Sequence, residues 1–122
     1  MFKVLKKIKK KFFYSFVGLW ITAKEEKSML VYLFIYSIFI GLGIWLKLNI
    51  TEWAIVIMVM FIVLTVEILN TAVEATVDSV SFQYNVKVKK IKDIASGATL
   101  VITTGMFVTF CIIYIPKLME AL

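Results

Sequence analysis

Histidine and arginine are both absent from this sequence, and cysteine and proline each occur once, at Cys111 and Pro116. Without histidine and without a second cysteine, we expect no zinc or haem site and no disulfide within the chain. A hard cation held by oxygen ligands stays possible. Because all 14 basic residues are lysine, any contact with phosphate has to come from ammonium groups or backbone amides and not from a guanidinium fork.

Nucleotide-binding sequence motifs are absent as well. The chain has neither a G-x-x-x-x-G-K-[ST] phosphate loop nor the glycine-rich loop of protein kinases. Charged residues make up 18% of the 122 residues and hydrophobic residues 61%, so the chain is too apolar for a soluble domain and too short for more than one module. The sequence therefore predicts a single membrane domain over residues 1–122.

The N-terminal segment is basic and aromatic. Residues 3–11 hold six lysines, and apolar residues recur at every fourth position from Val4 to Trp20. This spacing gives one apolar face and one basic face, so we predict a helix over residues 3–22 that lies in the membrane interface. The alternative is a signal peptide, for which the Ile-Thr-Ala of residues 21–23 would be a poor cleavage site.

Three longer apolar segments are predicted to cross the membrane, at residues 29–48, 53–80 and 94–115. As a helix the second is about 42 Å long, which exceeds the hydrocarbon core, so one of its ends has to protrude. We expect a lysine-rich loop at residues 81–92, and we expect Pro116 to end the third span. The predicted fold is all-α: an interfacial helix followed by three transmembrane helices.

The lysines also predict the orientation of the chain. Twelve of them lie either in the N-terminal segment, counted through Lys27, or in residues 81–92, whereas Lys47 and Lys117 lie on the other side. Because lysine is enriched on the cytoplasmic side of membrane proteins, we expect a multi-pass protein of the cytoplasmic cell membrane whose N-terminus is cytoplasmic.

A polar stripe within the second span is the most informative feature of the sequence. At about 100° per residue, Glu67, Asn70, Glu74 and Asp78 fall on one side of the helix. A charge at such depth costs from about 2.5 kcal/mol upward and usually faces a bundle interior or a wet cavity. Three carboxylates repel one another unless a cation or a lysine lies among them. The stripe therefore predicts a cation site beside the lysines of residues 87–92, or a polar contact that holds an oligomer together.

Two further expectations follow from these residues. Three short helices cannot shield three acids from lipid, so we expect a homo-oligomer. Lys92 and Asp93 can belong to the cation site, or Asp93 can cap the third span while Lys92 is one more topology-setting charge.

The stripe and the segment that follows the second loop resemble the signature of the prokaryotic diacylglycerol kinase family, which includes the undecaprenol kinases of Gram-positive bacteria. The residues that carry the resemblance are Glu67-Ile68-Leu69-Asn70-Thr71-Ala72-Val73-Glu74, Asp78, Lys92-Asp93 and Ser96-Gly97-Ala98. The resemblance implies a homotrimeric membrane kinase with sites shared between subunits. It would use Mg²⁺ and move the γ-phosphate of ATP to the hydroxyl of a membrane lipid alcohol, either diacylglycerol or undecaprenol.

The resemblance also implies a role for each matching residue. Glu67 would be the general base, and Glu74 and Glu26 would hold Mg²⁺. Contacts with ATP would come from Glu74, Asn70, Lys92, Asp93, Tyr84 and Tyr14, and Ser96 would lie near the lipid. The expected partners are ATP, a lipid alcohol and further copies of the chain, with no nucleic acid.

Two other classes of function compete with a lipid kinase. The acids of the stripe could line the path of a small oligomeric cation channel or transporter, although residues 53–63 offer no polar residue on that face. The basic N-terminal face could instead belong to a structural membrane anchor, which leaves Glu67 unexplained. The all-lysine, isoleucine-rich composition is typical of an AT-rich genome and favours undecaprenol weakly as the lipid.

Overall fold

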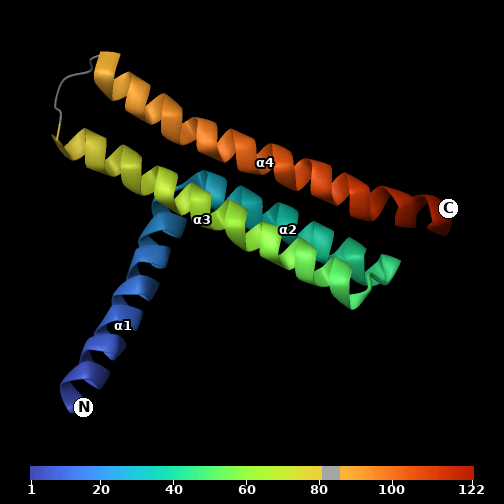
Figure 1. Cartoon of the computed structure of the whole chain (residues 1–122), viewed down its shortest axis with the longest axis horizontal. Helices are drawn as coiled ribbons and strands as arrows, with labels where there is room; N and C mark the ends of the chain where they lie inside the picture. Colours follow the sequence, from blue (N-terminus) through green and yellow to red (C-terminus); the bar gives the residue numbers. More distant parts are fainter. Residues whose placement is uncertain (81–85) are drawn as a thin grey trace.

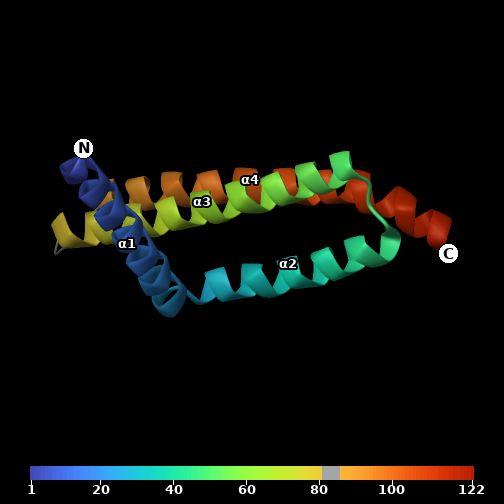
Figure 2. The ribbon, with the colours of Figure 1, turned by 90° about the horizontal axis from the view of Figure 1, so that it is seen from below.

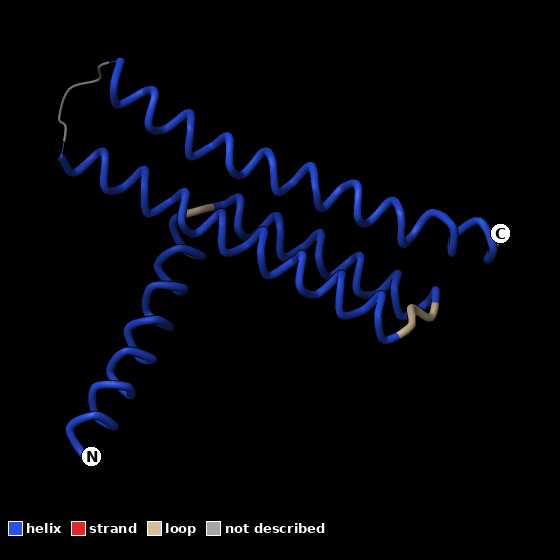
Figure 3. The backbone as a smooth tube through the Cα atoms, viewed as in Figure 1, coloured by secondary structure: helices blue, strands red, loops and turns tan. Residues whose placement is uncertain are grey.

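The computed structural model describes residues 1–80 and 86–122, and within these ranges the chain is almost entirely helical. Its helices are α1 (Phe2–Glu25), α2 (Lys27–Leu46), α3 (Ile50–Val80) and α4 (Val86–Ala121). Helices α2, α3 and α4 run alongside one another, whereas α1 leaves them at a steep angle (Figure 1). The described ranges contain helices and short connections without a strand (Figure 3).

Helices α2, α3 and α4 are long and apolar enough to cross a membrane, with 20, 31 and 36 residues. At 1.5 Å per residue α3 and α4 are about 46 and 54 Å long, so both extend beyond a hydrocarbon core of about 30 Å. Large apolar side chains on their outer faces are exposed, among them Phe34, Phe61 and Phe107. Lipid is the solvent that such faces require. The predicted fold class, three membrane helices preceded by a separate N-terminal helix, is confirmed.

A single residue separates α1 from α2. Glu26 has an extended backbone, with φ −104° and ψ 105°, which turns the chain sharply. Its amide donates to the Thr22 carbonyl at 2.8 Å, and its carbonyl accepts from the Met29 amide at 3.3 Å. Main-chain hydrogen bonds therefore close the last turn of α1 and the first turn of α2 on either side of Glu26.

The connection from α2 to α3 is equally short. Lys47 has a left-handed backbone, with φ 58°, and ends α2. Asn49 and Glu52 then start α3 with a reciprocal capping box, in which each side chain accepts from the backbone amide of the other at 3.0 and 2.9 Å. Close packing at this turn requires Gly43, because a Cβ there would lie 2.8 Å from Cη2 of Trp53.

Helices α3 and α4 are antiparallel, and an ion pair near each end shows their register. Lys92 Nζ lies 2.6 Å from Asp78 Oδ1 at one end, and Lys117 Nζ lies 3.0 Å from Glu52 Oε1 at the other. Helix α2 lies to one side of this pair (Figure 2). Most of the buried core belongs to the half of the bundle nearer the α2–α3 turn; its members are Tyr36, Leu46, Leu48, Val56, Met60, Val63, Met106, Phe110, Ile113 and Tyr114.

The ends of the third span differ from the sequence-based expectation. Helix α4 begins at Val86, so residues 86–92 are helical and not part of a loop. It also continues through Pro116 to Ala121. Proline lacks the amide that would bond the carbonyl four residues earlier, but in the last turns of a helix this removes one bond without ending the helix. Helix α1 likewise extends to Glu25, three residues beyond the predicted end at residue 22.

Candidate active site

Glu67 occupies a position of α3 where packing would favour an apolar residue. Val56, Met60 and Val63 are the other buried residues of this helix, and Glu67 continues their spacing of three and four. Its side chain is only 7% exposed, in one chain and without a partner subunit. A buried carboxylate needs compensating hydrogen bonds or charges, so the residues around Glu67 have to supply them.

Ser28 supplies one of these compensating contacts. Its Oγ donates a hydrogen bond of 2.9 Å to Oε1 of Glu67, across 39 positions of sequence and from the first turn of α2. On α3 itself, the Thr71 hydroxyl donates to the backbone carbonyl of Glu67 at 3.1 Å. The start of α2 therefore lies directly beside the buried acid.

Asn70 and Thr99 each carry a buried polar atom that has no hydrogen-bond partner among the described residues. These atoms are Asn70 Oδ1 on α3 and Thr99 Oγ1 on α4. Asn70 precedes Asp78 by eight residues and Thr99 follows Lys92 by seven, so the register set by the Asp78–Lys92 pair places both at one level of the bundle. An enclosed polar atom without a partner costs about 1–3 kcal/mol, which a bound hydroxyl or water can recover.

The remaining acids of the stripe lie closer to the end of α3. Glu74 is half-buried, whereas Asp78 is exposed and makes the ion pair with Lys92. Lys92 is itself partly buried, with a side chain 35% exposed. Lys92 of α4 therefore supplies part of the positive charge that the acids of the stripe require.

Asp93 does not cap a helix. It is the eighth residue of α4, because that helix begins at Val86, so the alternative role as an N-terminal cap is wrong. Its carboxylate instead pairs with Lys89 on the same helix at 2.6 Å, with both side chains exposed. Lys92 and Asp93 thus contact different partners, although they are neighbours in sequence. Ser96, one turn further along α4, is exposed.

The other predicted site residues are Glu26, Tyr14 and Tyr84. Glu26 is half-buried at the α1–α2 break, two residues before Ser28, so the backbone at Glu26 lies next to the start of the stripe. Tyr14 is on α1, 66% exposed, and twelve residues before Glu26, which is about 18 Å along the helix axis. It borders a shallow hollow that is also lined by Lys7, Lys10, Lys11 and Ser15. Tyr84 lies outside the described residues.

The carboxylates do not form a large cluster within one chain. Among residues 1–80 and 86–122, no group of three or more acidic, histidine or cysteine side chains could enclose a metal ion. The ligands expected from the sequence, Glu26 and Glu74, are two hard oxygen donors on different elements. Oxygen donors of this kind suit Mg²⁺, which retains several waters and is commonly bound through one or two carboxylates plus substrate phosphates.

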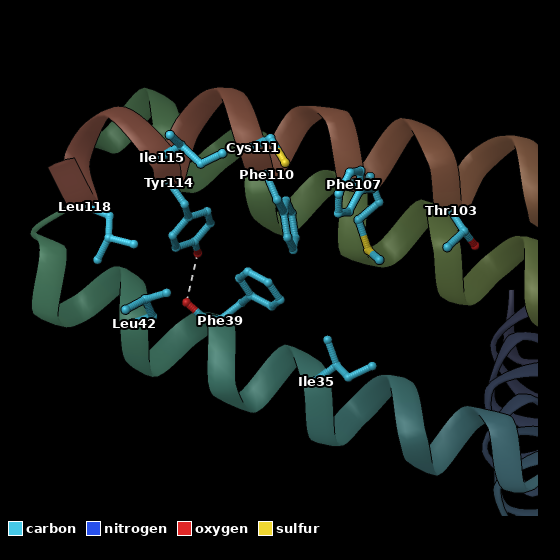
Figure 4. A pocket seen from close by; sticks show the side chains of 11 residues that line it. Ile35, Phe39, Leu42, Thr103, Phe107, Phe110, Cys111, Tyr114, Ile115 and Leu118 are labelled. Carbon is cyan, nitrogen blue, oxygen red and sulfur yellow. Dashed lines mark hydrogen bonds between the residues drawn. The ribbon is translucent and has the colours of Figure 1, made fainter.

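An apolar hollow lies elsewhere in the bundle. It has a volume of about 380 Å³ and separates α2 from α4, with Thr103 at one end and Leu118 at the other. Figure 4 shows its aromatic wall and the hydrogen bond of 2.8 Å from the Tyr114 hydroxyl to the Phe39 carbonyl. No charged residue lines it, so it is a packing feature between membrane helices and not the place of a polar reaction.

Ser28, Thr99 and Thr103 are polar residues that the sequence analysis did not assign to the site. Ser28 follows a run of charged residues and lies one residue before the predicted start of the first span. Thr103 lies within the predicted third span, and its Oγ1 lies 3.4 Å from the Tyr32 hydroxyl on α2. A serine that precedes an apolar span by one residue is the signal that could have drawn attention to Ser28.

Comparison with known proteins decides the family. The family model for prokaryotic diacylglycerol kinase matches residues 13–114. The chain belongs to the prokaryotic diacylglycerol kinase family. An undecaprenol kinase of Bacillus subtilis is 32% identical over 112 residues, covering 88% of this chain and 91% of the relative. A diacylglycerol kinase of Pseudomonas aeruginosa is 33% identical over 100 residues, covering 82% and 81%. A Helicobacter pylori diacylglycerol kinase is 30% identical over 99 residues, covering 81% and 77%.

Membership of the diacylglycerol kinase family confirms the prediction of a lipid kinase that crosses the membrane several times. All residues to which the resemblance gave a role, from Tyr14 to Ser96, lie within the matched range. The comparisons thus favour a lipid kinase over a channel subunit or a structural anchor.

Proposed function

We propose that this chain uses ATP and Mg²⁺ to phosphorylate the hydroxyl of a membrane lipid alcohol, diacylglycerol or undecaprenol, at the cytoplasmic face of the membrane. The observation that carries the proposal is the burial of Glu67 within a membrane helix, with one carboxylate oxygen bonded to Ser28. A lipid hydroxyl is reached from the bilayer, and a carboxylate at this depth is suited to remove its proton as a general base.

The proposed step has one proton transfer and one phosphoryl transfer. The proton of the lipid hydroxyl goes to the carboxylate of Glu67, and the lipid oxygen forms a bond to the γ-phosphorus of ATP. The bond from that phosphorus to the β–γ bridging oxygen breaks, and its electron pair stays on ADP. Phosphoryl transfer of this kind depends mainly on positioning and on stabilisation of charge, so the protein needs no covalent intermediate.

Lysine ammonium groups are the proposed phosphate contacts. Lys92 is tied to the stripe by its 2.6 Å pair with Asp78, which keeps it within reach of phosphates that approach Glu74. Asn70 is proposed to contribute its amide to the same region, and Asp93, Tyr84 and Tyr14 to contact the nucleotide. Charged, amide and hydroxyl side chains make these proposed contacts, because the chain contains no arginine.

Mg²⁺ is proposed to be held by Glu74 and Glu26. Both are half-buried carboxylates, and Glu26 is fixed by the hydrogen bonds that close the α1–α2 break. When bound with ATP, the ion supplies neutralisation of the charge that develops on the transferring phosphate. Ser96, exposed on α4 and one turn from both Lys92 and Thr99, is proposed to contact the lipid.

The proposed oligomer is a homotrimer with shared sites. Helix α1 points away from the bundle (Figure 1). Tyr14 lies near the middle of α1, about 18 Å from Glu26 along the helix axis. A nucleotide contact from Tyr14 is therefore most easily made to the site of a neighbouring copy. The N-terminus and residues 81–92 are proposed to be cytoplasmic, because 12 of the 14 lysines lie in residues 3–27 and 81–92.

Transfer of radiolabelled γ-phosphate from ATP to lipid tests the proposed function. Purified protein is given a lipid extract with diacylglycerol or undecaprenol added, and the labelled product is separated by chromatography. We expect label in one lipid phosphate and its loss in the Glu67→Gln variant. Glu120→Gln is the matched control, because Glu120 is an exposed glutamate near the far end of α4. Failure to label either lipid would refute the proposal.

A further inference from the structure

Ser28 uses its hydroxyl differently from most other serines and threonines of the helices. Eight of the others donate to a carbonyl three or four residues earlier on the same helix: Ser15, Thr22, Ser37, Thr65, Thr71, Thr76, Ser79 and Thr104. Ser28 instead donates across the bundle to a carboxylate. A bond back to its own helix is not available to it, because α2 begins only one residue earlier.

The backbone that carries Ser28 is held on both sides. The Glu26 amide bonds to the last turn of α1, and the Glu26 carbonyl accepts the Met29 amide in the first turn of α2. Met29 is itself buried. Ser28 therefore lies between a closed helix junction and a buried neighbour, which gives its hydroxyl a defined position relative to α3.

We infer that Ser28 is a positioning residue for the Glu67 general base, an inference that rests on the proposed function. The hydrogen bond engages Oε1 of Glu67 and leaves Oε2 to accept the proton of the lipid hydroxyl. A carboxylate held by one oxygen has its second oxygen in a fixed place, and positioning of this kind contributes to catalysis through geometry. Ser28 contacts neither the phosphate nor the lipid oxygen in this arrangement.

The same bond also joins α2 to α3, so its loss could act through packing alone. Kinetics separate the two possibilities. Loss of positioning lowers kcat and leaves the KM values for Mg-ATP and lipid almost unchanged. It also depends on the presence of the base, so it disappears when Glu67 has been replaced, whereas a packing defect persists in that background.

The experiment compares Ser28→Ala, Ser28→Thr and the double variant Ser28→Ala/Glu67→Gln with the unaltered protein. Ser37→Ala is the matched control, since Ser37 is an exposed serine of the same helix that bonds only to its own Leu33 carbonyl in the structure. We expect Ser28→Ala to lower kcat by about 10- to 100-fold with KM values changed by less than about twofold. Ser28→Thr, which keeps the hydroxyl, is expected to restore at least about a third of kcat, on the same physical basis. The double variant is expected to match Glu67→Gln alone.

Each other outcome overturns the inference in a recognisable way. Equal kcat for Ser28→Ala and Ser37→Ala, with the kcat of Glu67→Gln lowered by about 10² to 10⁴, refutes the role of Ser28 and leaves the proposed function intact. A further loss in the double variant, or a threonine variant as impaired as alanine, assigns Ser28 to packing. Near-normal kcat in Glu67→Gln shows that Glu67 is not the general base, and it then refutes both the proposed role of Glu67 and the positioning role of Ser28. Thermal unfolding of every variant identifies any that fail to fold, and the threonine variant then provides the test.

Discussion

Replacing Glu67 by glutamine should remove the proton acceptor of the site with little change in its packing. The amide has nearly the same volume as the carboxylate, so it continues the buried face formed by Val56, Met60 and Val63. Its carbonyl oxygen can still accept the hydrogen bond from Ser28. Loss of a general base typically costs about 10² to 10⁴ in rate, so we expect kcat to fall by that factor while KM for Mg-ATP stays nearly constant.

Glu74→Gln should produce a different kinetic defect. Glu67 and Glu74 are seven residues apart on one face of α3, which is about 10 Å along the axis, so one ion cannot bind both. Glu74 is also less buried and nearer the end of the helix where Lys92 meets Asp78. As a metal ligand it should affect Mg-ATP binding, so we expect both a higher KM for Mg-ATP and a lower kcat, with partial recovery at high Mg²⁺.

The assay measures initial rates of phosphate transfer to lipid in mixed micelles, with Mg-ATP varied at saturating lipid and free Mg²⁺ varied separately. Glu120→Gln again controls for the general effect of removing one carboxylate. If Glu67→Gln retains near-normal kcat, the carboxylate is not the base. If the Glu67 and Glu74 variants show the same defect and the same response to Mg²⁺, the stripe acts as one electrostatic unit and the separate roles are wrong.

Three further predictions concern orientation, subunit sharing and packing. In a cysteine-free background, a cysteine at Lys87 should be protected from an impermeant maleimide on intact cells and one at Glu120 should react; the reverse pattern would invert the orientation. Mixing inactive subunits that lack the base with inactive Lys92→Ala subunits should restore some activity, and absence of rescue at every ratio would argue against composite sites. Gly43→Ala should destabilise the protein by about 1–3 kcal/mol in thermal or denaturant unfolding because its Cβ would meet an indole at 2.8 Å, whereas Gly41→Ala, with nothing within 4 Å, should not.

The length of the apolar segments and the spacing of their residues made the architecture predictable. These signals did not predict where the helices end. The three membrane helices follow from runs of about 20 or more apolar residues, which have no other stable state in a membrane. The start of α4 was not predictable in this way, because residues 86–92 are mostly lysine and carry no apolar period. Lysine is nevertheless a good helix former, so the helix continues outside the apolar run.

The site was predictable where chemistry lies on one element and unpredictable where it depends on contacts between elements. Glu67 and Asp78 could be placed on one face of α3 from their spacing alone. The contacts of Ser28 with Glu67 and of Lys92 with Asp78 cross between helices, and only the packing of those helices sets them. The separate partner of Asp93 is a local contact at spacing four, but it becomes visible only once the start of α4 is known.

The face of α3 changes from apolar to acidic at Glu67, and the proposed function uses this change in place of a phosphate loop. Toward the α2–α3 turn the face is apolar and packed, and toward residue 80 it is acidic and increasingly exposed, ending at the Asp78–Lys92 pair. Glu67 is the first acid on the buried side of that border. In the proposed reaction, a nucleotide that arrives from water meets the exposed acids and lysines first, and a lipid hydroxyl that arrives from the bilayer meets the buried end first. The two substrates differ in the solvent they come from, and a single helix that crosses the boundary between those solvents can present a different residue to each.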